Sequence, residues 1–100
     1  MKRRSEERRL AALRDEVPQL REQRRMLDEQ VAYVAAIADD ARVRASVAET
    51  PLADREREQA EDDLRRASAQ RDEVAQRLED IRAEQDRLLE RMFGRREQVR

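Results

Sequence analysis

The sequence predicts an all-α protein in which two long helices form an antiparallel coiled-coil hairpin. Apolar residues recur along the chain at alternating intervals of three and four, which is the spacing of a coiled-coil seam. Charged residues make up 47% of the 100 residues and aromatic residues only 2%, so a compact globular core is not expected. The net charge of −1, together with the regular apolar spacing, argues against a disordered chain.

The first helix is predicted over residues 5–48. Ser5 can cap its N-terminus, and two glutamates follow in the first turn, where the helix dipole favours negative charge. Twelve seam positions, spaced alternately by three and four residues, run from Leu10 to Ala48. Eleven of them are apolar, and the exception is Arg24. This regularity predicts one helix face that is buried along its whole length.

Pro18 falls inside this predicted helix. A proline there removes a backbone hydrogen bond and clashes with the preceding turn, which destabilises a helix by ~3 kcal/mol. It follows seam residue Val17 and lies on the outer side of the seam. Two readings are open: a single helix with a kink near Pro18, or a separate short helix before it. The kink is the preferred reading.

The chain breaks in the middle, at Thr50 and Pro51. Threonine is a good N-cap, and proline is favoured at the first helical position because its missing N–H has no partner there in any case. This predicts a turn at about 49–51, a second helix over about 51–93 capped by Gly94, and a basic tail at 94–100. Nine of twelve seam positions in the second helix are apolar.

A short joint between two helices with equal numbers of seam positions makes them antiparallel neighbours. Large seam side chains lie toward the chain termini in both helices, and alanines lie toward the turn in both, as folding back at Thr50 requires. One hundred residues therefore form a single hairpin unit. Each helix should be roughly 65 Å long at 1.5 Å per residue.

Four seam positions are polar: Arg24, Arg57, Arg71 and Gln85. One reading is that the arginine side chains extend out of a narrow seam and keep their charged heads in water. The other is that these residues fix the register of the two helices at some loss of stability, as polar seam residues can. All four occupy the same heptad position, which favours the second reading slightly.

The sequence contains no histidine and no cysteine, so the usual bases, nucleophiles and soft metal ligands are absent. Its carboxylates fall on helix faces where no pocket is expected to desolvate them. We therefore expect a protein that is not an enzyme and that has no cofactor, metal or small-molecule substrate. No apolar run is long enough to act as a signal or membrane segment, and cytoplasmic localisation is the expectation.

A second apolar surface lies beside the seam of the first helix. It consists of Tyr33, Ile37 and Val47 on one flank, with Val43 next to them on the outer face. These residues have no partner in a two-helix hairpin, and small scaffolds often need association to be stable. They are either scattered exposed residues or a docking surface, and the docking surface is preferred. It would serve a homodimer with four helices or a helix of another protein.

Charge is distributed unevenly along the predicted rod. Residues 2–9 carry a net charge of +3 and residues 91–100 another +3, and the hairpin brings these segments together. Residues 39–63, around the turn, carry −5. The basic end is either a pair of solvated termini or a contact site for nucleic acid or an acidic partner. Its candidate residues are Lys2, Arg3, Arg4, Arg8, Arg9, Arg95 and Arg96.

In outline, a helical hairpin with acidic residues at its turn resembles the coiled-coil arm of bacterial transcript-cleavage factors, which act in the secondary channel of RNA polymerase. Glu49 and Asp54 flank the turn as the tip acids of those factors would. The spacing of these acids matches no tip motif, and the 100 residues hold no counterpart of the family's globular domain. Two functions follow as expectations: a structural or adaptor protein that acts by helix–helix association, or an accessory factor of nucleic acid or the transcription machinery.

Overall fold

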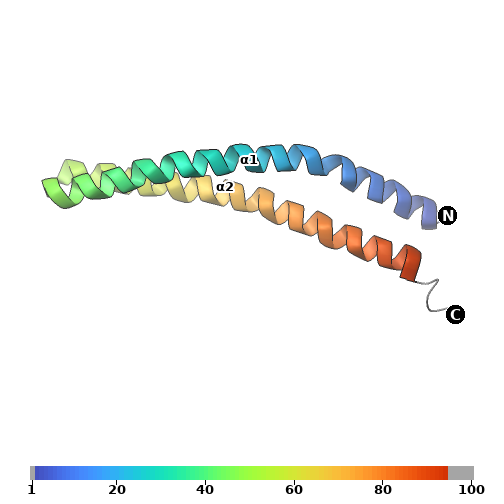
Figure 1. Ribbon diagram of the computed structural model, residues 1–100. Coiled ribbons are helices and arrows are strands. Elements are labelled where there is room, and N and C mark those ends of the chain that lie inside the picture. Colours follow the sequence, from blue (N-terminus) through green and yellow to red (C-terminus); the bar gives the residue numbers. More distant parts are fainter. Residues whose placement is uncertain (1, 95–100) are drawn as a thin grey trace.

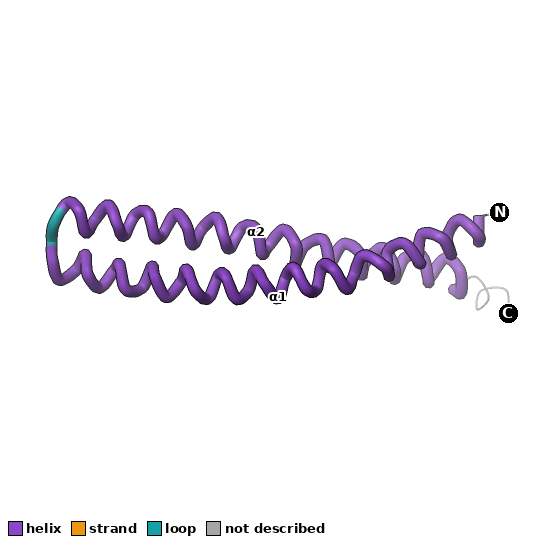
Figure 2. The backbone as a smooth tube through the Cα atoms, turned by 90° about the horizontal axis from the view of Figure 1, so that it is seen from above, coloured by secondary structure: helices purple, strands orange, loops and turns teal. Residues whose placement is uncertain are grey.

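The chain reverses direction at Glu49 and Thr50, between two long helices. The computed structural model describes residues 2–94, in which α1 spans Lys2–Ala48, α2 spans Pro51–Leu89 and a short π-helical turn, η1, spans Glu90–Gly94. The helices lie side by side in a rod of 73 × 23 × 15 Å, with the turn at one end and both termini at the other (Figures 1 and 2). The prediction of an all-α antiparallel hairpin is confirmed.

The turn satisfies the backbone groups that the two helix ends leave free. Glu49 adopts a left-handed conformation with φ of 51°, and its N–H donates to the carbonyl oxygen of Ala45 at 3.1 Å, which ends α1. The Thr50 hydroxyl oxygen accepts a hydrogen bond from the Ala53 N–H at 3.1 Å, and Pro51 follows the cap. The threonine therefore caps α2 as its sequence context predicts.

The first helix runs without interruption through Pro18. It begins at Lys2, three residues before the predicted start, so no separate short helix precedes the proline. Figure 1 shows that α1 curves over its N-terminal part in the same direction as α2. Leu13 on this arm is fully buried against Ile81 and Leu88 of α2. This packing holds the arm to the hairpin despite the lost hydrogen bond.

The buried core follows the predicted seam. Among residues 2–94 every buried side chain occupies a predicted seam position: Leu13, Ala38, Ala41, Ala45, Ala53, Ala60, Ala67, Ile81 and Leu88. Large aliphatic residues form a cluster at the end of the rod that holds the termini, and alanines form a second cluster nearer the turn. An alanine side chain is fully covered only where the facing helix comes close, so the small residues set the helix spacing there.

The polar seam residues keep their heads at the surface. Arg57 pairs with Glu61 at 3.2 Å, and Arg71 lies 3.9 Å from Asp28 across the seam, each with its side chain one-third exposed. No buried side-chain nitrogen or oxygen lacks a hydrogen-bond partner in the part of the chain that the structure describes. The arginine stems therefore cover the seam while the guanidinium groups stay in water, which is the first of the two readings.

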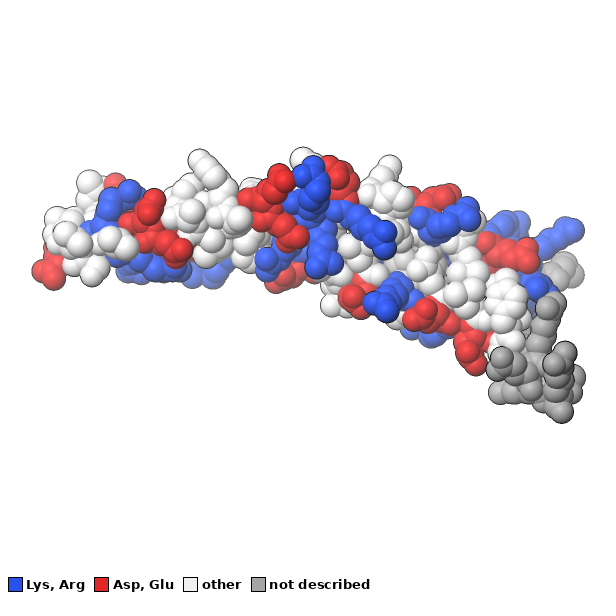
Figure 3. Space-filling model, in the orientation of Figure 1, with Lys and Arg blue, Asp and Glu red and all other residues white. Residues whose placement is uncertain are grey.

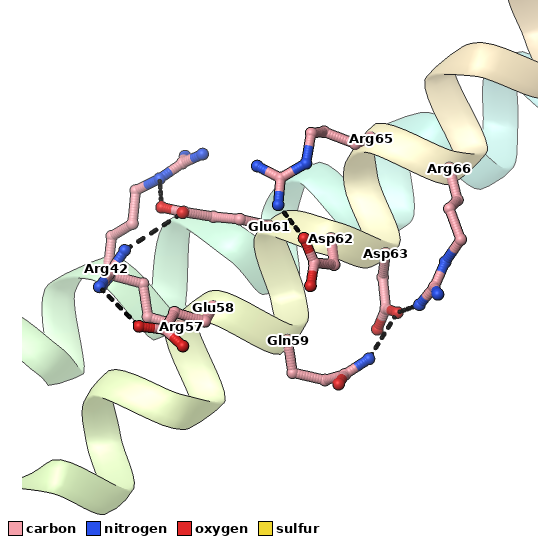
Figure 4. Close-up of polar contacts among 9 residues, drawn as sticks. All are labelled: Arg42, Arg57, Glu58, Gln59, Glu61, Asp62, Asp63, Arg65 and Arg66. Carbon is pink, nitrogen blue, oxygen red and sulfur yellow. Dashed lines mark hydrogen bonds and ion pairs between the residues drawn. The ribbon is translucent and has the colours of Figure 1, made fainter.

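Ion pairs link the two helices at the edges of the seam. Arg9 donates two hydrogen bonds to Glu84 at 2.8 and 3.0 Å. Arg42 donates to Glu61 at 3.0 Å near the turn, where Arg57 binds the same carboxylate (Figure 4). The arginine hydrogen bonds lower the pKa of both Glu84 and Glu61, so both carboxylates are ionised at neutral pH. Exposed pairs of this kind add little stability.

The second helix continues into the π-helical turn instead of stopping at a glycine cap. Gly94, which the sequence suggests as the residue just outside the helix, lies within this last turn. Phe93 in the same turn is about half exposed, and the Arg3 guanidinium lies 5.9 Å above its ring. This cation–π contact links the first turn of α1 to the end of the second helix. Arg95 and Arg96 of the predicted basic tail lie outside the described residues.

Candidate interaction surface

The four predicted flank residues are solvent-exposed on the hairpin. The exposed fractions are 71% for Tyr33, 40% for Ile37, 63% for Val43 and 81% for Val47. The seam of α1 is already filled by contacts with α2, so the hairpin itself offers these side chains no further cover. A large, rigid aromatic ring at 71% exposure is an anchor of the kind found at protein interfaces.

The structure adds two apolar residues to this flank. Met26 precedes Tyr33 by one heptad on α1 and is 58% exposed. Leu52, in the first turn of α2, is 61% exposed and reaches the flank from the other helix. The seven-residue spacing could have identified Met26 in the sequence, whereas Leu52 joins the flank only through the geometry of the turn. We call Met26, Tyr33, Ile37, Val43, Val47 and Leu52 the apolar flank.

Shallow grooves between the helices follow the apolar flank. Near the turn, Val43 and Val47 of α1 and Leu52 of α2 line one groove. Ile37 lines the next with Ala60 of α2, and Met26 lines a third with Val74 farther along the rod. The structure thus brings three of the four predicted flank residues into grooves and leaves Tyr33 outside them. Side chains of a partner could enter these grooves between α1 and α2.

One row of α1 on this flank has no charge over five turns. Its members share the alternating spacing of three and four residues, one position round from the seam, and are either apolar or carry a side-chain amide: Gln19, Gln23, Met26, Gln30, Tyr33 and Ile37. Nearly half of all residues in the chain are charged. An uncharged row of this length is therefore distinct from the remaining surface, where both signs alternate (Figure 3).

The predicted basic end is partly engaged in the fold. Arg9 is held by Glu84, and Arg3 lies 3.5 Å from Glu7 as well as over Phe93. Arg4 and Arg8 line a small groove on α1 with Ala11, and Lys2 is exposed. The basic residues at this end therefore do not converge on one described site, and Arg3 and Arg9 already contact the second helical segment.

A stronger basic site lies at mid-rod, which the sequence reasoning missed. A groove beside Pro18 and Leu78 is lined by five arginines: Arg14, Arg21, Arg24, Arg25 and Arg82. Asp28 and Glu79 also line the groove, and Arg25 is paired with Glu22 at 2.6 Å and with Glu29 at 2.7 Å. Arg21 and Arg82 form no ion pair within residues 2–94. We call this site the arginine groove.

The acidic residues at the turn are exposed and form no metal-binding group. Glu49 and Asp54 lie on either side of the Thr50 cap. Across residues 2–94 no three histidine, cysteine, aspartate or glutamate side chains converge closely enough to hold a metal ion. The described helices also include no stretch long and apolar enough to cross a membrane.

No protein-family model, no curated protein and no solved structure matches the chain. Its function is therefore argued from the surface features of the hairpin, of which the apolar flank and the arginine groove are the two most distinct.

Proposed function

We propose that this protein is a non-catalytic structural or adaptor protein that acts by helix–helix association through the apolar flank. The observation that carries the proposal is the run of exposed apolar side chains beside an already filled seam. Exposed apolar side chains on a rod are stabilised when a partner covers them. The simplest partner is a second copy, which would convert two hairpins into a four-helix homodimer. The absence of cysteine fits work in the reducing cytoplasm.

The homodimer is tested by a double substitution, Tyr33→Glu with Ile37→Glu. We expect the parent to sediment as a dimer at micromolar concentration and the variant as a monomer, because association would bury two uncompensated carboxylates. The matched control is Ala69→Glu with Ala83→Glu, which adds the same charge at two exposed alanines on the outer face of α2, away from the apolar flank. Sedimentation equilibrium gives the masses, and circular dichroism checks that all three chains are equally helical.

Two results would contradict the proposal. If the parent is a monomer, the flank does not join two copies. If the glutamate variant is as dimeric as the control, association runs through another surface. In the expected case only the flank variant becomes a monomer. The position of the glutamates, and not the added charge itself, is then the cause of dissociation.

The arginine groove supports a second candidate function, the binding of nucleic acid through its phosphates. Arg21 and Arg82 come from different helices, lie in one groove and have no acidic partner among the described residues. Phosphate groups would neutralise their mutual repulsion, and such binding would carry no sequence preference. This role corresponds to an accessory factor of nucleic acid or the transcription machinery, with its contact site at mid-rod.

The second function predicts a salt-dependent affinity for single-stranded RNA. Fluorescence anisotropy with a labelled 20-nucleotide polyuridylate should show binding at 50 mM salt that falls steeply as salt rises. Arg21→Ala with Arg82→Ala should weaken it and reduce the slope of log affinity against log salt by about 1.4, which is roughly 0.7 per lost phosphate contact. Arg4→Ala with Arg8→Ala removes two charges from the basic end and serves as the control. Equal losses in both variants would mean that the groove is not the site.

A further inference from the structure

We infer that the occupant of the apolar flank is a second copy lying antiparallel, with its turn at the inner edge of the basic end of the first copy, next to Arg9. This inference rests on the proposed function and adds the orientation and the alignment of the two rods. In this arrangement a twofold axis crosses the rods within one turn of Gln30. Met26 of each copy then lies near Tyr33 of the other, and Val47 lies near Ala12 of the other.

The distribution of charge along the rod selects the antiparallel orientation. Residues 39–63 next to the turn carry −5, and residues 2–9 at the opposite end carry +3. A parallel pair would place two acidic turns together and two basic ends together. An antiparallel pair separates the two acidic turns, and an axis near Gln30 sets each turn at the level of Arg9 of the other copy, so each acidic turn borders a basic end.

The apolar and uncharged side chains of α1 select the alignment. The uncharged row runs from Gln19 to Ile37, and Gln30 lies in its middle part. An axis near Gln30 aligns residues 23–37 of the row with the same stretch of the second copy, so this part of the row meets uncharged row members, while Gln19 faces Asp40. It also gives both Met26 and Tyr33, each more than half exposed, an apolar neighbour from the second copy. Sulfur–aromatic contacts of this kind are favourable.

The overlap has the dimensions of a stable interface. An axis near Gln30 leaves about 40 residues of α1 facing the second copy, or ~60 Å at 1.5 Å per residue. This is most of the 73 Å rod. A standard interface buries about 800 Å² on each partner, and the chain exposes 7984 Å² in total. Covering one side of most of the rod supplies that area, whereas contact at the turns alone would supply much less.

Because the chain has no cysteine, single cysteines can map the arrangement directly. Three variants of the full chain are made: Gln30→Cys near the axis, Val47→Cys near the turn and Ala12→Cys near the basic end. Each is treated with a short bismaleimide cross-linker, alone and in pairs. We expect Gln30→Cys to cross-link to itself, and Val47→Cys to cross-link strongly to Ala12→Cys but only weakly to itself. The dissociation constant of the parent should rise several-fold from 50 to 500 mM salt, because salt screens the attraction between the ends.

Strong self-cross-linking of Val47→Cys, without cross-linking to Ala12→Cys, would overturn the antiparallel arrangement. A dimer that tightens with salt would do the same, because like charges would then face one another. If the glutamate substitutions at Tyr33 and Ile37 still abolish that dimer, the proposed function stands and only the orientation fails. If those substitutions leave the dimer intact, the apolar flank is not the interface and both proposals fail together.

Discussion

Truncation of the Ile81 side chain should lower the stability of the hairpin more than any surface substitution does. We expect Ile81→Ala to lower the free energy of unfolding by about 2–5 kcal/mol, the range for removing a buried aliphatic side chain. Ile81 is fully buried and packs in one cluster with Leu13 and Leu88. This cluster holds the arm of α1 that contains Pro18 against α2, so its loss removes packing where the helix is intrinsically weakest.

Urea denaturation followed by circular dichroism measures this loss. All chains are compared at one protein concentration, because self-association would make apparent stability depend on concentration. Glu79→Ala, two residues away on the exposed face of α2, is the matched control and should change stability by less than about 0.5 kcal/mol. Similar losses in the two variants would mean that the seam does not run through Ile81. A wild-type slope with a shifted midpoint would show that the fold itself is retained.

The seam could be predicted from the sequence because its signal repeats. Twenty of the twenty-four predicted seam positions carry an apolar residue. If the seam were assigned one residue earlier or later in either helix, this series of apolar side chains would face solvent. The turn could be predicted equally well from the sequence, because Thr50 and Pro51 act through local backbone chemistry that tertiary packing does not alter. The structure confirms the hairpin that these features predict, with the buried residues at seam positions.

Features that depend on both helices together were harder to predict. The loss of helix stability at Pro18 is a local effect. The packing that offsets it joins Leu13 to Ile81, a residue almost 70 positions later in the sequence. Leu52 joins the apolar flank only because the turn places the start of α2 beside the end of α1. The arginine groove likewise combines residues of both helices, such as Arg21 and Arg82. In the sequence these arginines are indistinguishable from the many others in the chain.

Two kinds of seam share one hairpin, and they respond differently to substitution. Near the termini, large side chains such as Leu13 and Ile81 fill the space between the helices. Toward the turn, Ala38, Ala41 and Ala60 are almost fully buried although their side chains are the smallest that carry a methyl group. The first kind of seam is sensitive to the removal of volume, and the second is sensitive to its addition.

Enlarging an alanine of the second seam should therefore destabilise the hairpin. We expect Ala38→Leu to lower the free energy of unfolding by about 1–3 kcal/mol, because the added carbons force the helices apart or side chains out of their preferred rotamers. Ala36→Leu is the control: it makes the same change two residues away, at an exposed position of the same helix. Alanine and leucine have similar helix propensities, so this control should be nearly neutral.

The same denaturation measurement compares the two leucine variants, and the sign of the difference is decisive. A leucine at position 38 that stabilises the hairpin would mean that the space beside Ala38 is open, and that the helices do not approach closely near the turn. Equal effects at positions 36 and 38 would mean that the seam does not distinguish these two faces of α1. With Ala38 fully covered and Ala36 exposed, the geometry requires a loss at position 38 alone.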